Sequence, residues 1–189
     1  MNQMELFSRI QLKPEETILL IIDIQTKLMA AMEARERVCR NTSILLTTAR
    51  ELQIPVVVTE QYPRGLGSTV PELEQQLPPE ARRLEKSSFD AARDGLLSIL
   101  DEFERHSVII CGTEAHICVY QTACSLLGQG YSVFPIEDAI CSRSACNCQS
   151  GLSLMGRMVA WTLTTEGAVF DLLKVSGTSA FKTISKALR

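Results

Sequence analysis

Three short runs of aliphatic residues, none of them broken by a polar residue, limit the folds open to this chain of 189 residues. The runs are Ile18–Ile22, Val56–Val58 and Val108–Cys111. Runs of this length and composition are typical of strands buried on both faces, which occur in parallel sheets covered by helices. The sequence therefore predicts an α/β fold.

Segments with apolar residues at helical spacing separate these runs. We expect helices over residues 36–53, 95–104 and 144–158, a helix beginning near Cys118, and two helical pieces in 166–188 that break near Gly177. Further strands are expected over 84–87, 131–138 and 160–165. The alternation predicts a doubly wound, six-stranded parallel sheet with helices on both faces, a Rossmann-type three-layer sandwich, in one domain over residues 1–189.

Two polar residues follow the first and last of the three runs. Asp23 ends the run Ile18–Ile22, and Cys118 lies beyond Val108–Cys111. If the chain reverses direction so that these two strands become neighbours, a topological switch point lies between them, where ligands bind in open α/β sheets. Asp23 and Cys118 are then expected to face each other, although Asp23 is also suited to cap the turn that follows it.

Cys118 is placed at a strand-to-helix turn. The free N–H groups and positive end of a helix stabilise a thiolate there, which would lower the pKa of the cysteine and make it a nucleophile. The alternative is an inert, buried thiol, which is the commoner state of cysteine. Cys141, Cys146 and Cys148 cluster without a second pair at metal-ligand spacing, so we interpret them as incidental thiols.

Composition narrows the classes of partner. The net charge is −3, and no Lys/Arg cluster is interleaved with aromatic residues, so nucleic acid is not an expected partner. The apolar runs are too short to cross a bilayer, and Glu5 and Arg9 stand where a signal peptide would be apolar. The cysteine count is seven, an odd number that fits reduced thiols, so we expect a cytoplasmic protein with no membrane partner.

Four separated segments together resemble the isochorismatase-like cysteine hydrolases. They are ILLIIDIQ, VVVTEQYPRGLGSTVPEL, the lysine ahead of SSF, and VIICGTEAHICVYQTA, and the TEQYP-type loop resembles the isochorismatase-domain-containing branch most. The resemblance implies a catalytic Asp, Lys and Cys, which correspond to Asp23, Lys86 and Cys118. From its position alone, Lys86 would be a solvated lysine at a strand end.

The resemblance also implies a mechanism. Asp23 would take the thiol proton, Lys86 would hold the carboxylate and the thiolate by its charge, and Cys118 would attack a carbonyl carbon to form a thioester that water cleaves. A cis peptide bond between Thr113 and Glu114 would accompany an oxyanion hole made of the Glu114 and Cys118 main-chain N–H groups.

The expectations about substrate and cofactor come from differences between this sequence and other members of the family that it resembles. Related nicotinamidases bind a metal through an Asp and two His in the loop after the second strand, but TEQYPRGLG contains no histidine, so neither a metal nor another cofactor is expected. In the relative that hydrolyses isochorismate, the nucleophile position is not a cysteine. Cys118 therefore implies a small amide, N-carbamoyl or related C–N substrate.

Four residues are candidates for the substrate pocket: Gln25, Tyr62, Phe89 and His116. Phe89 is interpreted as core rather than contact, and His116, one of two histidines, as structural rather than catalytic, since Asp23 is the family base. Glu60 is interpreted as a structural or pocket polar group.

Two other functions stay open. The first is a catalytically quiet binding or scaffold protein, against which the intact Asp23, Lys86 and Cys118 set argues. The second is thiol redox chemistry between Cys118 and Cys111 or Cys124, although neither pair forms a C-x-x-C motif. Because relatives commonly assemble, the resemblance implies a homo-oligomer.

Overall fold

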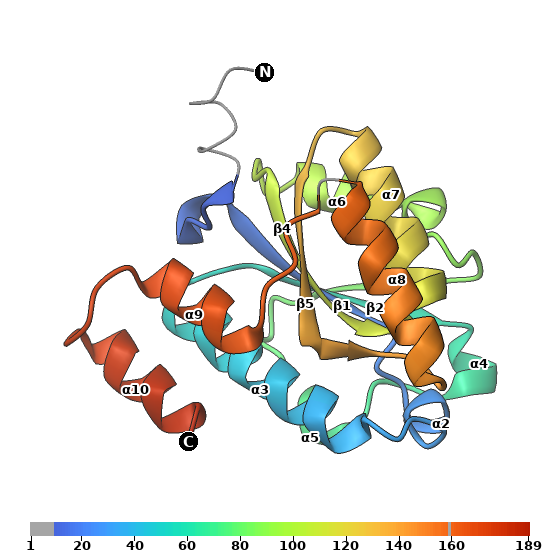
Figure 1. Ribbon diagram of the computed structural model, residues 1–189, viewed down its shortest axis with the longest axis horizontal. Helices are drawn as coiled ribbons and strands as arrows, with labels where there is room; N and C mark the ends of the chain where they lie inside the picture. Colours follow the sequence, from blue (N-terminus) through green and yellow to red (C-terminus); the bar gives the residue numbers. More distant parts are fainter. Residues whose placement is uncertain (1–9, 159) are drawn as a thin grey trace.

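The computed structural model describes residues 10–158 and 160–189, so Glu5 and Arg9 lie outside the described part of the chain. Five parallel strands form one sheet in the order β3-β2-β1-β4-β5 (Figure 1). Their bounds are Thr17–Ile22 (β1), Val56–Gln61 (β2), Arg82–Lys86 (β3), Ser107–Thr113 (β4) and Ser132–Cys141 (β5).

The central pair of strands confirms the predicted switch point. β2 and β3 follow β1 outward on one side, and β4 then returns to the other side of β1, with Ile22 paired to Gly112. Every residue of β1 and of β4 is buried, as the unbroken aliphatic runs predict.

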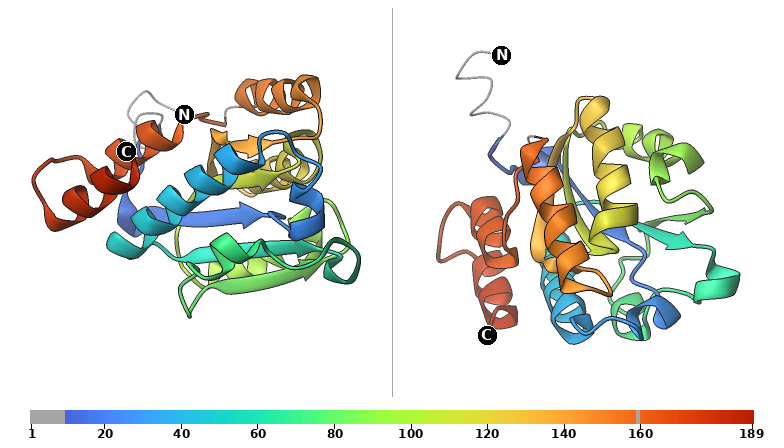
Figure 2. Two further views of the ribbon diagram at one scale, coloured as in Figure 1. Left: turned by 90° about the horizontal axis from the view of Figure 1, so that it is seen from below. Right: turned by 45° about the vertical axis from the view of Figure 1, so that its right-hand side comes forward.

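Helices cover both faces of the sheet (Figure 2). On one face, α3 (Arg35–Glu51) and α9 (Thr165–Leu173) pack against β5, and α10 (Ser179–Ala187) packs on α3. The other face carries α6 (Leu96–Asp101), α7 (Tyr120–Gly128) and α8 (Ala145–Arg157). The connections after β1 and β2 hold the short helices α2 (Thr26–Met29), α4 (Pro63–Leu66) and α5 (Pro71–Glu74). The predicted three layers are thus present.

Residues 160–165 do not form the predicted sixth strand. Leu163 makes a single isolated parallel bridge with Ile136, next to a hydrogen bond from the Trp161 N–H to the Val133 carbonyl oxygen. Thr164 then caps α9, because its side chain accepts a hydrogen bond from the Gly167 N–H. The cap ends the extended segment after one bridge, so the sheet of the described residues has five strands.

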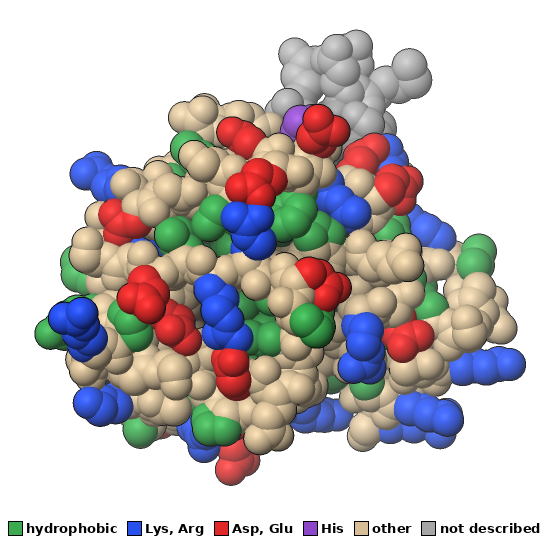
Figure 3. All heavy atoms as spheres, turned by 180° about the vertical axis from the view of Figure 1, so that it is seen from behind, with side chains coloured by type: hydrophobic (Ala, Val, Ile, Leu, Met, Phe, Trp, Pro, Cys, Tyr) green, Lys and Arg blue, Asp and Glu red, His purple; other side chains and the backbone are tan. Residues whose placement is uncertain are grey.

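Surface charge and helix length are relevant to the predictions about nucleic acid and membrane partners. Figure 3 shows Lys and Arg side chains interspersed with Asp and Glu on the rear face, without a large field of one sign. Within residues 10–158 and 160–189, every helix is too short or too polar to span a bilayer.

Candidate active site

Asp23 follows β1 directly and is completely buried. Its backbone is left-handed, with φ of 51°, a conformation that aspartate tolerates better than most residues. Oδ1 accepts a hydrogen bond of 2.6 Å from Thr59 Oγ1, and the carbonyl oxygen accepts one of 2.7 Å from Thr113 Oγ1. Among the described residues no main-chain N–H donates to this carboxylate, so the helix-cap alternative is wrong.

Lys86 is the last residue of β3, and its side chain has no exposed surface. The ammonium group donates to Asp23 Oδ2 at 2.7 Å, to Gln61 Oε1 at 2.7 Å and to the Ser88 carbonyl oxygen at 3.3 Å. Three acceptors match its three N–H bonds, which is the arrangement that makes a buried charge tolerable. The interpretation as a solvated lysine is therefore wrong.

Cys118 lies beside this ion pair. It sits in a π-helical turn, η3 (Ala115–Val119), between β4 and α7, and is 6% exposed. Burial first, and then the negative charge of Asp23, raise the pKa of the Cys118 thiol to about 12, while the positive charge of Lys86 acts to lower it. The expected lowering of the pKa by a helix N-terminus is wrong, because burial and the carboxylate outweigh it.

A glycine permits the close approach of the two central strands. Gly112 has φ of 123°, and a Cβ atom there would lie 1.9 Å from the Ile22 carbonyl oxygen. A side chain at this position would push β4 away from the end of β1. Gly112 therefore helps to keep the Cys118 turn close to Asp23.

The other cysteines are not brought to this site. All seven are free, and the Cys111 sulfur packs on the opposite side of the sheet, 3.7 Å from Thr42 Oγ1 and 3.9 Å from the Leu20 carbonyl oxygen. Burial raises the pKa of Cys111 to about 12 as well. Cys124 lies 3.7 Å from Met158 Sδ. These positions do not favour a redox pair with Cys118.

Glu114 joins β4 to the Cys118 turn through a cis peptide bond after Thr113, the position that the family resemblance implies. Its carboxylate accepts hydrogen bonds from the Arg143 main-chain N–H at 3.0 Å and from Arg143 Nε at 3.2 Å. Arg143 was missed by the sequence reasoning, because nothing in the pattern links two residues separated by a whole strand.

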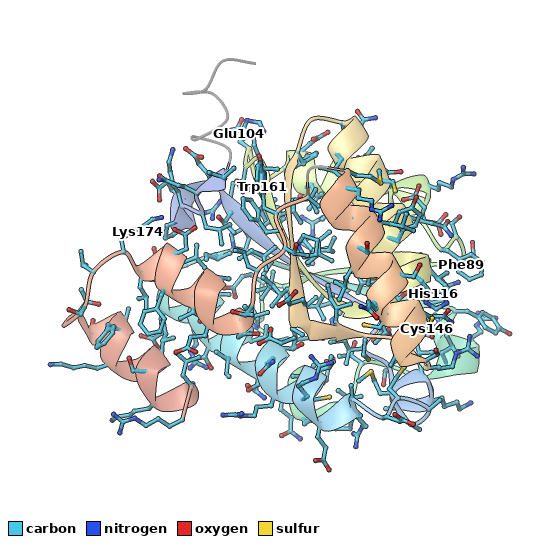
Figure 4. The ribbon with its side chains drawn as sticks, viewed as in Figure 1. Phe89, Glu104, His116, Cys146, Trp161 and Lys174 are labelled. Atoms are coloured by element: carbon cyan, nitrogen blue, oxygen red, sulfur yellow. The ribbon has the colours of Figure 1, made fainter. Side chains whose placement is uncertain are left out.

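The four predicted pocket residues differ in their surroundings. Gln25 is buried. Its Nε2 donates to the Gln61 carbonyl oxygen at 3.0 Å and its Oε1 accepts from the Gln61 N–H at 2.8 Å, so it holds the loop after β2. Tyr62 is 61% exposed and Phe89 is 54% exposed, so the interpretation of Phe89 as core is wrong. Figure 4 shows Phe89 and His116 on the same side of the molecule, and His116 Nδ1 lies 3.0 Å from Ser142 Oγ.

Glu60 has a structural role, since its Oε1 accepts hydrogen bonds of 2.7 Å from the Thr69 N–H and hydroxyl. In the part of the chain that the structure describes, no three His, Cys, Asp or Glu side chains lie close enough to hold a metal ion.

A cavity of about 640 Å³ lies next to this site, between α8, the end of β5 and the start of α3. Ser142 and Arg143 form part of its wall, whereas Asp23, Lys86 and Cys118 do not. The cavity therefore touches the residues that hold the Cys118 turn rather than the ion pair itself.

Comparisons with known proteins match most of the chain. The family model of the isochorismatase domain matches residues 17–167. The chain is 36% identical over 180 residues to isochorismatase domain-containing protein 2 of Danio rerio, covering 94% of this chain and 89% of that protein. It is 32% identical to the secreted isochorismatase effector Isc1 of Phytophthora sojae, over 95% and 87%. The solved structure of the MAR1 ribonuclease of Caenorhabditis elegans superposes with a TM-score of 0.89 at 31% identity, covering 94% of this chain and 92% of that one.

Proposed function

The chain belongs to the isochorismatase family, and on that premise we propose that it is a metal-independent cysteine hydrolase of small amides, N-carbamoyl compounds or related C–N substrates. The observation that carries the proposal is the fully buried ion pair of Lys86 Nζ and Asp23 Oδ2, 2.7 Å long, beside a buried cysteine thiol. A buried charge pair is costly to keep, and such groups concentrate at sites that perform chemistry.

In the proposed reaction Asp23 is the general base. The thiol proton passes from Cys118 to the Asp23 carboxylate as Sγ bonds to the substrate carbonyl carbon. When the tetrahedral intermediate collapses, the C–N bond breaks and the leaving nitrogen takes the proton from Asp23. Water then attacks the thioester, gives a proton through Asp23 to the departing Cys118 sulfur, and releases the acid.

The raised pKa of Cys118 fits this order of events. A thiol with a pKa of about 12 is protonated at neutral pH, so it needs a base at the moment of attack rather than a standing thiolate. Lys86 has all three N–H bonds engaged. Its proposed role is therefore a fixed positive charge that orients Asp23 and stabilises the thiolate as it forms, and not proton donation.

Acylation with p-nitrophenyl acetate tests the proposal. We expect a burst of one p-nitrophenolate per chain and one acetyl group on the peptide containing Cys118, both abolished in Cys118→Ala. Cys111→Ala is the matched control, a buried cysteine on the opposite side of the sheet, and should keep the burst. Acetylation of another residue, or a burst that survives in Cys118→Ala, would contradict the nucleophile and favour the binding-protein alternative. A positive result leads to a panel of amides and N-carbamoyl compounds.

The remaining predictions on partners are part of the same proposal. A small-molecule substrate, a homo-oligomer and a cytoplasmic location are what we expect of this chain. One relative is described as a ribonuclease, so RNA cleavage belongs in the substrate panel, with Cys118→Ala as its control. RNA cleavage lost in that variant would contradict the prediction that nucleic acid is not a partner.

A further inference from the structure

We propose that Arg143, through the Glu114 carboxylate, is a positioning residue that holds the Glu114 main-chain N–H where the substrate oxyanion forms. The inference rests on the proposed function, since it concerns the acylation step of that reaction. Arg143 lies beyond the end of β5 and does not belong to the Asp23, Lys86 and Cys118 set.

The first observation is how completely Glu114 is held. The residue is 5% exposed, and its carboxylate bonds both the main chain and the guanidinium of Arg143. Its carbonyl oxygen accepts hydrogen bonds from the Ile117 N–H at 3.0 Å and the Val119 N–H at 3.2 Å. Both acceptor groups of Glu114, the carboxylate and the carbonyl oxygen, are therefore hydrogen-bonded, and its one donor is the main-chain N–H.

The second observation is that this N–H has no hydrogen-bond partner among the described residues. Nowhere in residues 10–158 and 160–189 is there an acceptor that takes a hydrogen bond from the Glu114 main-chain N–H. More than nine in ten buried main-chain N–H groups are paired, so an unpaired one in a residue this buried points to an atom supplied from outside. It lies on the turn that carries Cys118, where the carbonyl oxygen of a bound substrate would serve.

The third observation is that the neighbouring turn is fixed from the same side. His116 Nδ1 lies 3.0 Å from the hydroxyl of Ser142, the residue before Arg143. The α8 backbone also touches the turn at Gly151, where a Cβ atom would lie 2.6 Å from the Ala115 carbonyl group. Arg143 is then the charged member of a set of contacts that locates residues 114–118.

The charge of the pair explains why an arginine serves here. Burial acts to raise the pKa of Glu114, but the Arg143 main-chain N–H and guanidinium more than offset it, and the pKa is lowered. The carboxylate thus stays ionised and held. Without the guanidinium, the Glu114 carboxylate keeps only the main-chain N–H of residue 143 as a partner. Residue 114 then gains freedom to turn its own N–H away.

The test compares two reagents at Cys118. p-Nitrophenyl acetate forms an oxyanion when the sulfur attacks, whereas iodoacetamide is displaced at a saturated carbon and forms none. Arg143→Ala should slow acetylation of Cys118 by on the order of 10-fold or more while alkylation stays within about twofold. Arg143→Lys should recover part of the loss, and Arg157→Ala, an arginine at the end of α8, should change neither rate.

Each other result overturns the proposal. Equal slowing of both reagents in Arg143→Ala, with the thermal midpoint unchanged, would mean that Arg143 supports the thiol rather than the oxyanion donor. No slowing of either would mean that it supports neither. Wild-type Cys118 that alkylates but never acetylates would overturn the proposed function, and the role of Arg143 with it. Arg143→Lys reports on the charge with little risk to folding, because the Arg143 side chain is 61% exposed.

Discussion

Two ion pairs lie at the carboxyl edge of the sheet, and they differ in what surrounds them. Asp23–Lys86 has no exposed surface on either side chain, and its ammonium group is surrounded by three oxygen acceptors. Glu114–Arg143 pairs a side chain that is 7% exposed with one that is 61% exposed. The first pair has no surface exposed to bulk solvent in the protein without substrate, and it is suited to a base and its counter-charge. The second has one side in solvent and serves to locate a loop.

Removing one charge from the buried pair should have the largest effect. Lys86→Met leaves the Asp23 carboxylate buried without a cation, which should cost about 3–5 kcal/mol of the free energy of unfolding and abolish turnover. Urea unfolding and acetylation of Cys118 measure the two effects. Arg82→Ala, which breaks an exposed pair with Glu102, is the control and should shift the unfolding midpoint little.

A double variant sharpens this result. Asp23→Asn combined with Lys86→Met removes both buried charges, so it should regain much of the stability lost in Lys86→Met while turnover stays absent. If the double variant recovers turnover, the ion pair is structural and the proposed base is wrong.

The buried pair also shows what sequence could and could not predict. The aliphatic runs predicted that β1 and β4 are buried, because burial on both faces leaves a clear signal. That these strands are neighbours, with Asp23 beside the Cys118 turn, depended on the assumption that the chain reverses direction, which the sheet order confirms. The burial of the Lys86 side chain leaves no such signal in the sequence, since a lysine is usually exposed unless acceptors from distant segments surround it. Its role came from the family resemblance.

The wrong predictions have different physical causes. The pKa of Cys118 was expected to fall because the helix-end argument considers only local N–H groups, whereas burial and Asp23 are tertiary effects. Phe89 is hydrophobic, yet it lies exposed. The strand over 160–165 had the right composition, but the Thr164 cap began α9 too early. From the sequence, Arg143 would be expected to be an ordinary exposed arginine, and only the folded chain shows that it contacts Glu114.

Neutralising the base should separate thiol reactivity from turnover. Because the Asp23 charge raises the pKa of Cys118 and Lys86 lowers it, Asp23→Asn should lower that pKa and speed alkylation by iodoacetamide near neutral pH, by about 10-fold per unit of pKa. Acetyl turnover should fall, since no base remains to serve the leaving group and water. Peptide mass mapping over a pH series measures both.

Cys111 in the same sample is the internal control for that experiment. Its pKa is also raised to about 12, but by burial on the opposite side of the sheet, so its labelling should be slow in both proteins. Slower alkylation of Cys118 in Asp23→Asn would contradict the electrostatic prediction and mean that proton removal by Asp23 during the attack outweighs its effect on the pKa of the thiol.

The half-exposed pair should give the smallest effect, and one that depends on pH. The folded-state pKa of Glu114 is lowered, so its ionised form contributes stability above the ordinary glutamate pKa, and the contribution disappears as pH falls through the lower folded value. Glu114→Gln should therefore be less stable than wild type by about 1 kcal/mol at neutral pH, and the difference should shrink below about pH 4. Urea unfolding at the two pH values measures it, with the exposed Glu137→Gln as control. A difference that persists unchanged in acid would mean that Glu114 holds the loop by shape and hydrogen bonding alone, and the contrast with the buried pair would then lie in geometry rather than in charge.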